Sequence, residues 1–359
     1  MKLIITAGGQ GTKFWPYSRE AKPKQFQPII KDKSLFQYTV ETLVKSFNAD
    51  DIYVSTKRRY LGTALEQVSE IPVKNYILEP DYKKNRGPAE GLVFVTMSIN
   101  FPDEPLMLIQ VDCIRTPEDA FLNMITATEK VVKRDKKFIT GGIKATYPIL
   151  GVDYMQLGDE IVSDDEMEFY KVDKFVPRTD DFYKTKKLIQ DFHIVTHCNH
   201  TCWYPDLLLN DYKKYNPGWY KSLMEIKDVI GKRGEEKSID EIYAQMESGP
   251  TEDVISHSMN EGYAILLPFK WVDFGTWDSM YEYFSEDNKV YSEGKVLSLD
   301  AEGNLVKIKN PEKLVAVVGV KNLVVVDTDD ALLIIPRDRV SDVSGVVKKL
   351  DTEELREFI

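Results

Sequence analysis

Apolar runs and amphipathic segments alternate along the first part of the chain. The runs that predict strands lie at residues 2–6, 51–55, 75–78, 106–111 and 138–143. The segments whose apolar residues recur at helical spacing lie at residues 34–47, 61–68, 92–100 and 117–132. This alternation predicts βαβ units and an α/β fold, with a Rossmann-like mixed, mostly parallel sheet flanked by helices.

The pattern changes near residue 286. Residues 290–326 contain short strand-like runs separated by turns, and residues 340–359 have charged and apolar residues at helical spacing. We therefore expect one domain over residues 1–286 and a small β-rich, β-solenoid-like domain with a terminal helix over residues 287–359. The second domain has no catalytic constellation, so its expected role is to pack on the main domain and on another subunit in a homodimer.

The first predicted strand ends in a loop that contains Gly8, Gly9 and Gly11. Four cations follow it closely: Lys13, Arg19, Lys22 and Lys24. Glycines let backbone amides come close to a phosphate, so this loop suits a polyanionic nucleotide. A glycine-rich turn with solvated lysines is the alternative.

Two familiar phosphate-binding motifs do not fit this loop. Pro16 and Pro23 interrupt the helix that a dinucleotide-binding fingerprint requires, and no G-K-[ST] follows the glycines as in a Walker A loop.

The charge, the hydropathy and the cysteine content each argue against certain classes of protein. The net charge of −11 argues against a nucleic-acid-binding protein, although a local cationic loop still allows a small nucleotide. No apolar run approaches the roughly 20 residues that span a bilayer, so we expect no membrane association. Three cysteines fit a reducing cytoplasm better than a disulfide framework.

The loop belongs to a longer string, G-G-Q-G-T-K-F-W-P-Y-S-R followed by P-K-Q-F. This string resembles the signature of sugar-1-phosphate nucleotidyltransferases, in particular mannose-1-phosphate guanylyltransferases, G-G-x-G-T-R-L-W-P-x-S-R and then P-K-Q-F. Lys13 and Phe14 are the departures. The later string W-V-D-F-G-T-W, from Trp271 to Trp277, resembles the family's W-x-D-V-G-S-W. Two motifs in the family's order, far apart in the chain, argue for membership.

The resemblance implies a transfer reaction. The phosphate of a sugar 1-phosphate attacks the α-phosphorus of a nucleoside triphosphate, and pyrophosphate leaves. The best single expectation is GTP and mannose 1-phosphate, giving GDP-mannose. Lys13 and Lys24 are the expected catalytic cations, while Arg19 is expected to brace the loop. Nucleotide contacts are expected from Gly8, Gly9, Gly11, Thr12, Glu79, Asn85, Pro88 and Ala89.

Two carboxylates are the expected ligands of Mg²⁺. Asp112 stands at the end of the predicted strand 106–111, where ligands bind in α/β sheets, and Mg²⁺ prefers oxygen ligands. The family has A-D-H here and this chain has V-D-C. Asp273, in the second motif, is implied as the other ligand. The alternative for Asp273 is an N-cap of a helix at 276–284.

The resemblance also implies a sugar-phosphate site formed by Gly151, Gln156, Lys174 and Asn199. The departures on the sugar side are Asp153, Gln156 and Thr201. Further departures are Arg86 and Gly87, in the segment that would hold the base and ribose, and Asn260. They leave two alternatives open. One is the same reaction with another sugar 1-phosphate, such as a heptose or fucose phosphate. The other is a non-catalytic homologue that binds a nucleotide sugar and acts as a regulator or scaffold.

Residues 197–202, H-C-N-H-T-C, suggest a zinc site as a minor alternative. In an extended strand over 192–203, Cys198, His200 and Cys202 would share one face and His197 would face away. Structural zinc sites usually combine two separated ligand pairs. A polar sugar pocket with core cysteines is therefore the preferred interpretation.

Overall fold

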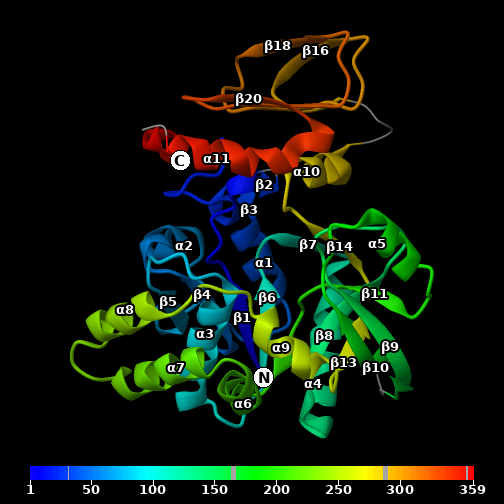
Figure 1. Cartoon of the computed structure of the whole chain (residues 1–359). Coiled ribbons are helices and arrows are strands. Elements are labelled where there is room, and N and C mark those ends of the chain that lie inside the picture. The colour runs from blue at the N-terminus through cyan, green and yellow to red at the C-terminus, as the bar shows by residue number, and fades with distance from the viewer. Residues whose placement is uncertain (31, 163–166, 286–289, 353–354) are drawn as a thin grey trace.

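The computed structural model describes residues 1–30, 32–162, 167–285, 290–352 and 355–359. Its centre is a ten-stranded sheet with the order β11-β9-β10-β13-β8-β12-β6-β1-β4-β5 (Figure 1). The strands of this sheet are β1 (Lys2–Thr6), β4 (Ile52–Lys57), β5 (Tyr76–Glu79), β6 (Leu106–Gln110), β8 (Ile139–Lys144), β9 (Tyr154–Ile161), β10 (Phe169–Val176), β11 (Ile194–His197), β12 (Cys202–Trp203) and β13 (Tyr263–Leu266).

The sheet has a parallel half and a largely antiparallel half. Strand β1 lies between β4 and β6 and is parallel to both, and β5 continues the parallel order beyond β4. Strands β9, β10, β11 and β12 pair antiparallel with their neighbours, whereas β8 and β13 are parallel to each other. The prediction of a mixed α/β sheet is confirmed, and mostly parallel pairing holds for the half around β1.

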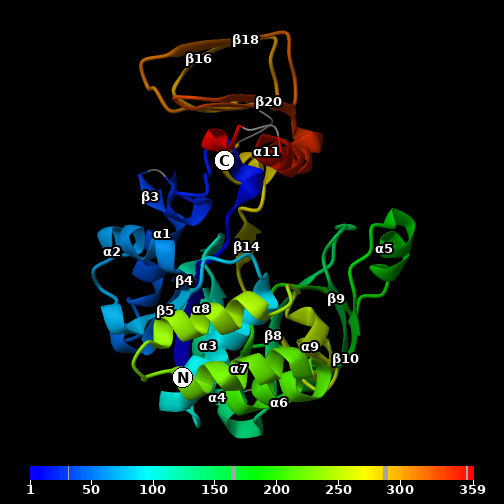
Figure 2. The ribbon, with the colours of Figure 1, turned by 60° about the vertical axis from the view of Figure 1, so that its left-hand side comes forward.

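Helices cover both faces of the sheet. One face carries α1 (Leu35–Leu43), α2 (Leu61–Gln67) and α4 (Glu118–Asp135). The other carries α3 (Arg86–Asn100), α6 (Pro205–Tyr215), α7 (Pro217–Val229), α8 (Glu235–Gln245) and α9 (Glu252–Met259), most of which Figure 2 shows in front. A short helix, α5 (Phe182–Leu188), lies beside β9 and β10. In the described part of the chain, no helix combines the length and apolarity needed to cross a lipid bilayer.

Helix α3 begins earlier than the sequence predicts. The expected helix over 92–100 starts at Arg86, because Asn85 caps it by accepting a hydrogen bond from the Arg86 amide at 2.7 Å. Asn85 has φ of 67°, a left-handed backbone value that asparagine tolerates better than most residues. Pro88 and Ala89 therefore lie in the first turn of a helix rather than in a loop.

The C-terminal strands stack in two layers. Strands β15 (Tyr291–Glu293), β17 (Leu305–Ile308) and β19 (Leu323–Asp327) are parallel, with β20 (Leu332–Pro336) antiparallel at the edge. Strands β16 (Lys295–Leu299) and β18 (Leu314–Val318) form a second parallel layer. This is the β-solenoid-like arrangement that the turn spacing predicts. The predicted domain boundary between residues 286 and 287 lies outside the described residues.

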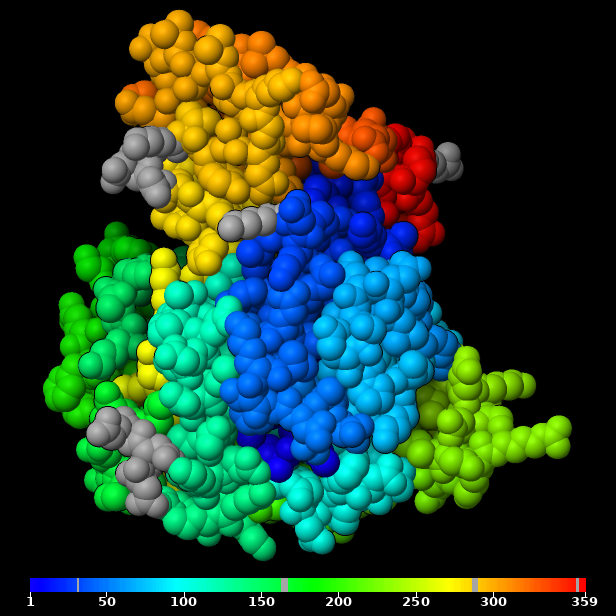
Figure 3. Space-filling view, turned by 180° about the vertical axis from the view of Figure 1, so that it is seen from behind, coloured from blue at the N-terminus to red at the C-terminus, as the bar shows by residue number. Residues whose placement is uncertain are grey.

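The C-terminal layers rest on the N-terminal loop through α10 (Trp277–Phe284) and α11 (Val343–Thr352), as Figure 3 shows from behind. One apolar core joins Phe14 and Trp15 to Trp277, Val324 and Val343. The indole Nε1 of Trp15 also donates to the Phe358 carbonyl at 2.6 Å. The chain end thus holds the loop that follows β1. The remaining strands are the hairpin β2 (Pro28–Ile30) and β3 (Lys33–Ser34), and the pair β7 (Cys113–Thr116) and β14 (Lys270–Asp273).

Candidate active site

A cavity of about 450 Å³ opens at the carboxyl ends of β1, β4, β5 and β6. This is the edge at which α/β sheets bind their ligands. Residues from the strand ends, the glycine loop and the start of α3 line it. They include Thr6, Gly8, Gly9, Gln10, Gly11, Thr12, Lys24, Gln25, Ser55, Lys57, Glu79, Lys83, Lys84, Asn85, Arg86, Ala89, Glu90, Gln110 and Asp112.

The glycine loop is held by side chains that bind its carbonyl groups. The Gln25 amide nitrogen donates to the carbonyls of Ala7 at 2.8 Å and Gly9 at 2.9 Å, and Ser18 donates to Gln10 at 2.9 Å. Among the described residues, no acceptor takes the backbone N–H groups of residues 8–12. The loop is therefore fixed on one side and presents free amide donors to the cavity, which suits phosphate oxygens.

Gly11 has a backbone conformation and a position that a side chain would not fit. Its φ is +63°, and a Cβ there would lie 2.7 Å from Cγ of Lys24. The stem of Lys24 thus runs directly beneath the loop. The glycine at this position lets the loop and the lysine occupy the same corner of the cavity.

The cavity is cationic although the chain is acidic. Five cations line it, namely Lys24, Lys57, Lys83, Lys84 and Arg86, against three carboxylates, Glu79, Glu90 and Asp112, which gives a formal charge of +2. Burial raises the pKa of both glutamates, despite the lowering effect of Lys57 on Glu79 and of Arg86 on Glu90. A site of this charge attracts a polyanion to a protein whose net charge is −11.

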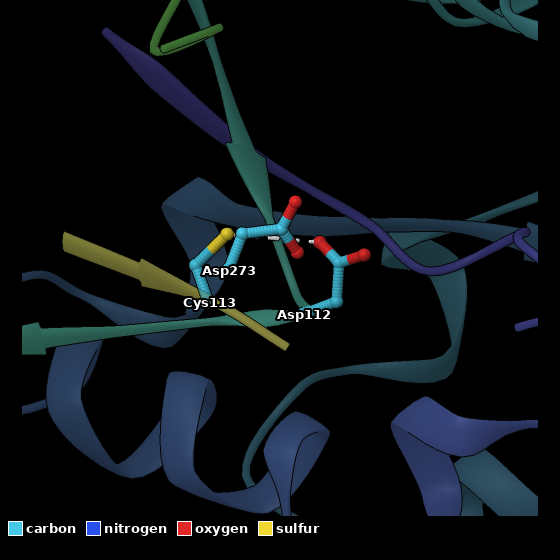
Figure 4. Close-up of side chains that lie close together, drawn as sticks. All are labelled: Asp112, Cys113 and Asp273. Atoms are coloured by element: carbon cyan, nitrogen blue, oxygen red, sulfur yellow. Dashed lines mark hydrogen bonds between the residues drawn. The ribbon is translucent and has the colours of Figure 1, made fainter. Parts of the chain in front are cut away.

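Asp112 lines one end of this cavity, and Asp273 lies beside Asp112, outside the cavity lining. Strands β7 and β14 pair antiparallel with Asp273 opposite Cys113, and the Phe274 amide donates to the Asp112 carbonyl at 3.0 Å. Side-chain ligand atoms of Asp112, Cys113 and Asp273 all lie within 4.8 Å of one another (Figure 4). The pairing of the two strands brings together carboxylates that are far apart in the sequence.

Lys24 completes this group. Its Nζ lies 2.8 Å from Oδ2 of Asp112 and donates to the Phe274 carbonyl at 2.7 Å. Burial disfavours ionisation of Asp112, but the charge and hydrogen bond of Lys24 outweigh it and lower the pKa. Desolvation and the charge of Asp112 together raise the pKa of Asp273. Among the described residues, Lys24 is the one cation that forms an ion pair with either carboxylate, and the charges of Lys13 and Arg115 also act on Asp273. Two close carboxylates fit a divalent cation, because their oxygen atoms are the donors that Mg²⁺ prefers.

Asp273 does not cap the helix that follows it. Thr276 is the N-cap of α10, and its hydroxyl accepts a hydrogen bond from the Ser279 amide. Helix α4 likewise begins at Glu118, well after Asp112. Neither aspartate is therefore used as a helix cap.

Arg115 supports Asp112, and the sequence analysis missed it. This buried guanidinium donates to the carbonyls of Gln110 at 2.8 Å and Cys113 at 3.2 Å, on either side of Asp112. Its Nε lies 2.9 Å from Nε2 of His200, whose Nδ1 lies 2.8 Å from the Cys198 carbonyl. Burial and the Arg115 charge lower the pKa of His200, so the imidazole is neutral and accepts from the arginine.

The expected extended strand over 192–203 is wrong. Strand β11 ends at His197, and Asn199 has φ of 50°, which breaks the alternation of faces. His200 therefore turns to Arg115, while Cys202 lies against the sulfur of Met1 at 3.5 Å. Among the described residues, His197 is the one member of this segment that joins a possible ligand group, with Asp153 and Glu252. The described residues of segment 197–202 therefore do not come together as the zinc site that was the minor alternative.

Glu79 lines the cavity beside the glycine loop. It is buried at the end of β5 and accepts a hydrogen bond from the Tyr243 hydroxyl at 2.9 Å. A Cβ on Gly8 would lie 3.1 Å from its Oε2, so this carboxyl directly faces the glycine loop. Burial raises its pKa to about 7, although Lys57 and the Tyr243 hydrogen bond act in the opposite direction.

An ion-pair network closes the side of the cavity where the sugar is expected. Arg86 lies 2.9 Å from both Glu90 and Glu252, and both of its terminal nitrogens lie 3.3 Å from Oδ1 of Asn199. Arg178 pairs with Asp153 at 2.5 Å. Glu252 was missed in the sequence because the surrounding segment matches the family weakly. The residue expected to replace the family's glutamate, Asn260, instead accepts from the Phe175 amide at 2.6 Å.

The other predicted site residues, among them Asp273 and Asn199, lie outside the cavity lining. Pro88 is buried in α3, Lys13 is exposed on a short turn at Thr12–Phe14, and Gly151 is exposed before β9. Gln156 and Lys174 face each other across β9 and β10. Of the predicted residues, the lining includes Gly8, Gly9, Gly11, Thr12, Lys24, Glu79, Asn85, Ala89 and Asp112. Arg19 braces the loop by donating to the Pro16 carbonyl at 2.7 Å and pairing with Asp330 at 2.7 Å.

Comparison with known proteins agrees with this architecture. Residues 2–151 match the family model described as nucleotidyl transferase, and residues 294–350 match the mannose-P isomerase/GMP-like β-helix domain. The xanthan biosynthesis protein XanB of Xanthomonas campestris pv. campestris is 27% identical over 360 residues, covering 97% of this chain and 72% of the relative. Mannose-1-phosphate guanylyltransferase RfbM of Salmonella typhimurium is 28% identical over 369 residues, covering 99% and 73%.

A solved structure has the same fold over almost its entire length. The crystal structure of mannose-1-phosphate geranyltransferase from Thermus thermophilus matches with a TM-score of 0.83 at 23% identity, covering 98% of this chain and 99% of that one. The chain therefore carries a nucleotidyl transferase domain ahead of a β-helix domain, and over almost its whole length it is similar to mannose-1-phosphate guanylyltransferases.

Proposed function

We propose that the chain transfers a guanylyl group from GTP to mannose 1-phosphate, releasing pyrophosphate and forming GDP-mannose. The observation that carries this proposal is the meeting of Asp112, Asp273 and Lys24 at the edge of a cavity of net positive charge that a loop of free amides lines. The names of relatives such as RfbM support the choice of base and sugar.

The chemical difficulty of this reaction is charge, because two polyanions must approach in line. The attacking phosphate is already an anion at neutral pH, so a general base is not required. Free amides of the glycine loop would bind the triphosphate, and Lys24 would lie beside the α-phosphate next to Asp112. Mg²⁺, held by Asp112 and Asp273, would neutralise phosphate charge when bound. Lys13, exposed on the neighbouring turn, adds a second cation, without the bidentate fork of an arginine.

Glu79 supports the choice of guanine. The Watson–Crick edge of guanine presents two adjacent N–H donors, and a carboxylate accepts from both, whereas adenine presents a donor beside an acceptor. Glu79 lines the same cavity as the glycine loop and lies next to it, because a Cβ on Gly8 would be 3.1 Å from its Oε2. Asn85 and Ala89, at the start of α3, would hold the ribose.

The ion-pair network supports a second candidate substrate, another sugar 1-phosphate. The Arg86 guanidinium already donates to Oδ1 of the Asn199 side chain, the residue that is expected to contact a sugar hydroxyl. Gly151, Gln156 and Lys174 would still meet the sugar and its phosphate from β9 and β10.

Pyrophosphate release tests both candidates. The purified chain is incubated with Mg²⁺, each of the four common nucleoside triphosphates and a panel of sugar 1-phosphates. We expect the highest rate with GTP and mannose 1-phosphate; a higher rate with another sugar identifies the second candidate. Asp112→Asn should abolish turnover, whereas Asp206→Asn, an exposed residue in the first turn of α6, should not. No product with any pair would refute the proposed reaction.

We also propose a homodimer formed through the outer β-helix layer. Leu297 and Leu299 on β16 and Leu314 and Val318 on β18 are between 58% and 64% exposed. Because the strands pair side by side, these side chains form one apolar face, and a two-fold axis would pair it with itself. Light scattering should give twice the chain mass, and Leu297→Glu with Leu314→Glu should give monomers.

A cytoplasmic location is proposed for the same chain. Cys113, Cys198 and Cys202 are all free and buried, as expected where thiols stay reduced. Cell fractionation of a tagged chain would test this.

A further inference from the structure

We propose that Cys113 makes the metal site a mixed oxygen–sulfur site, which binds a thiophilic divalent cation such as Zn²⁺ or Cd²⁺ in competition with Mg²⁺. The inference rests on the proposed function in one respect, that Asp112 and Asp273 form the Mg²⁺ site. It goes beyond that function because it assigns a ligand and an inhibitory metal class to this chain.

The backbone places the thiol next to the carboxylates. Cys113 follows Asp112 directly and lies opposite Asp273 in the β7–β14 ladder. Directly opposed residues of an antiparallel pair project to the same face, so the sulfur and the Asp273 carboxylate share one side (Figure 4). The three ligand atoms lie within 4.8 Å of one another, and a tetrahedral zinc site holds its ligands about 3.6 Å apart. Small side-chain rotations therefore suffice to close the site.

The surroundings of Cys113 favour this use of its sulfur. The residue is fully buried, and the polar atoms that contact Sγ are Oε1 of Gln110 and Oδ1 of Asp112, both at 3.7 Å. These are weak sulfur contacts, and one of them is to a proposed metal ligand. The thiol is thus enclosed by protein on other sides and directed at the carboxylate pair.

The same position already attracts a cation. The Lys24 ammonium lies 2.8 Å from Asp112, and the ligand atom of Asp273 lies within 4.8 Å of that of Asp112. Mg²⁺ uses oxygen donors and would leave the sulfur unused. Zn²⁺ and Cd²⁺ bind thiolates strongly, so they would take all three ligands. The thiol proton is released to solvent when such an ion binds.

The consequence is that thiophilic ions occupy the site without supporting turnover well. A cation held by three protein ligands has fewer positions for phosphate oxygens than Mg²⁺ held by two carboxylates. Micromolar thiophilic ions would then inhibit the enzyme even with millimolar Mg²⁺ present, and a chelator would restore activity.

Cd²⁺ titration of the metal-free full chain tests the inference through ultraviolet cadmium–thiolate absorption, which does not depend on activity. The wild type should develop this absorption at one equivalent of Cd²⁺, and excess Mg²⁺ should diminish it. Cys113→Ser should lose it and bind Cd²⁺ more weakly, by at least the roughly 10- to 100-fold that loss of an outer-sphere partner costs. Cys198→Ser, at another fully buried cysteine, is the matched control and should keep it.

Each outcome is decisive. Absence of the absorption in the folded wild type, or its loss in Cys198→Ser but not in Cys113→Ser, overturns the inference. If Cys113→Ser does not fold, Asp273→Asn provides the test, because it should weaken Cd²⁺ binding while every thiol remains. An active enzyme without cadmium–thiolate absorption refutes this inference alone, and cadmium binding by a chain without transferase activity refutes the proposed function alone.

Discussion

The buried carboxyl of Glu79 should make the stability of the protein depend on pH in an unusual direction. Its side chain faces the cavity and accepts a hydrogen bond from Tyr243. Burial is the largest cause of its raised pKa, about 7 compared with an ordinary 4.5. Between these two values the folded protein keeps the proton and the unfolded chain has lost it. Stability from this group is therefore complete below pH 4.5 and is lost as the pH rises through 7.

The size of the effect follows from the two pKa values. Each pKa unit corresponds to about 1.4 kcal/mol, so a rise from 4.5 to about 7 corresponds to about 3 kcal/mol. Glu79→Gln presents an uncharged side chain of the same size at every pH. Its free energy of unfolding, relative to the wild type, should therefore increase by about 3 kcal/mol between pH 4.5 and pH 7.5.

Urea unfolding of both proteins across this pH range measures the difference. Glu66→Gln, at an exposed position of α2, is the control and should follow the wild type closely. A constant difference between Glu79→Gln and the wild type across the range would refute the reasoning, because it would mean that Glu79 ionises equally in both states. A difference that decreases with pH would mean that Lys57 outweighs burial.

Three further perturbations test the site. Gly11→Ala should lower the free energy of unfolding by about 1–3 kcal/mol, because φ is +63° and the new Cβ would meet Lys24. Gly9→Ala is the control, because a Cβ there would have no atom within 4 Å, and its urea midpoint should be nearly unchanged. Equal midpoints for the two variants would contradict this prediction. Arg115→Lys keeps the charge but loses the guanidinium fork that reaches two carbonyls and His200. The melting temperature should therefore fall by an amount equivalent to about 2–4 kcal/mol of stability, and an unchanged melting temperature would contradict this. Deleting residues 355–359 removes the carbonyl that holds Trp15, so KM for the nucleotide should rise several-fold, and an unchanged KM would show that the loop needs no such support.

Local sequence patterns were sufficient to predict much of the cavity. The apolar run of β1, the three glycines and Lys24 are neighbours in sequence, and the structure keeps them neighbours in space. Asp112 was predictable because it follows a buried strand directly, and such positions face the ligand edge of a parallel sheet. The β-solenoid-like layers were predictable from regularly spaced turns.

Other features depend on contacts between distant segments, which no local pattern records. Arg115 meets His200 across 85 positions, and Arg86 meets Glu252 across 166. The strand over 192–203 was wrongly predicted because alternating polar and apolar residues favour extension, whereas Asn199 adopts a left-handed conformation that a tertiary contact with Arg86 accompanies. Polar side chains in such networks look like surface residues until their partners are known.

The position of Asp273 depends on how the C-terminal β-helix domain packs on the rest of the chain. Strand β14 is held on β7 by only four residue pairs, so this short ladder alone fixes the backbone weakly. The helix that follows contributes Trp277, which is fully buried and donates to the Trp15 carbonyl at 3.1 Å, in the apolar core shared with Val324 and Val343. Packing of the β-helix domain therefore holds both the loop after β1 and the second carboxylate. Because positioning errors near 1 Å can cost about 100-fold in rate, substitutions in this core should reduce turnover before they unfold the protein.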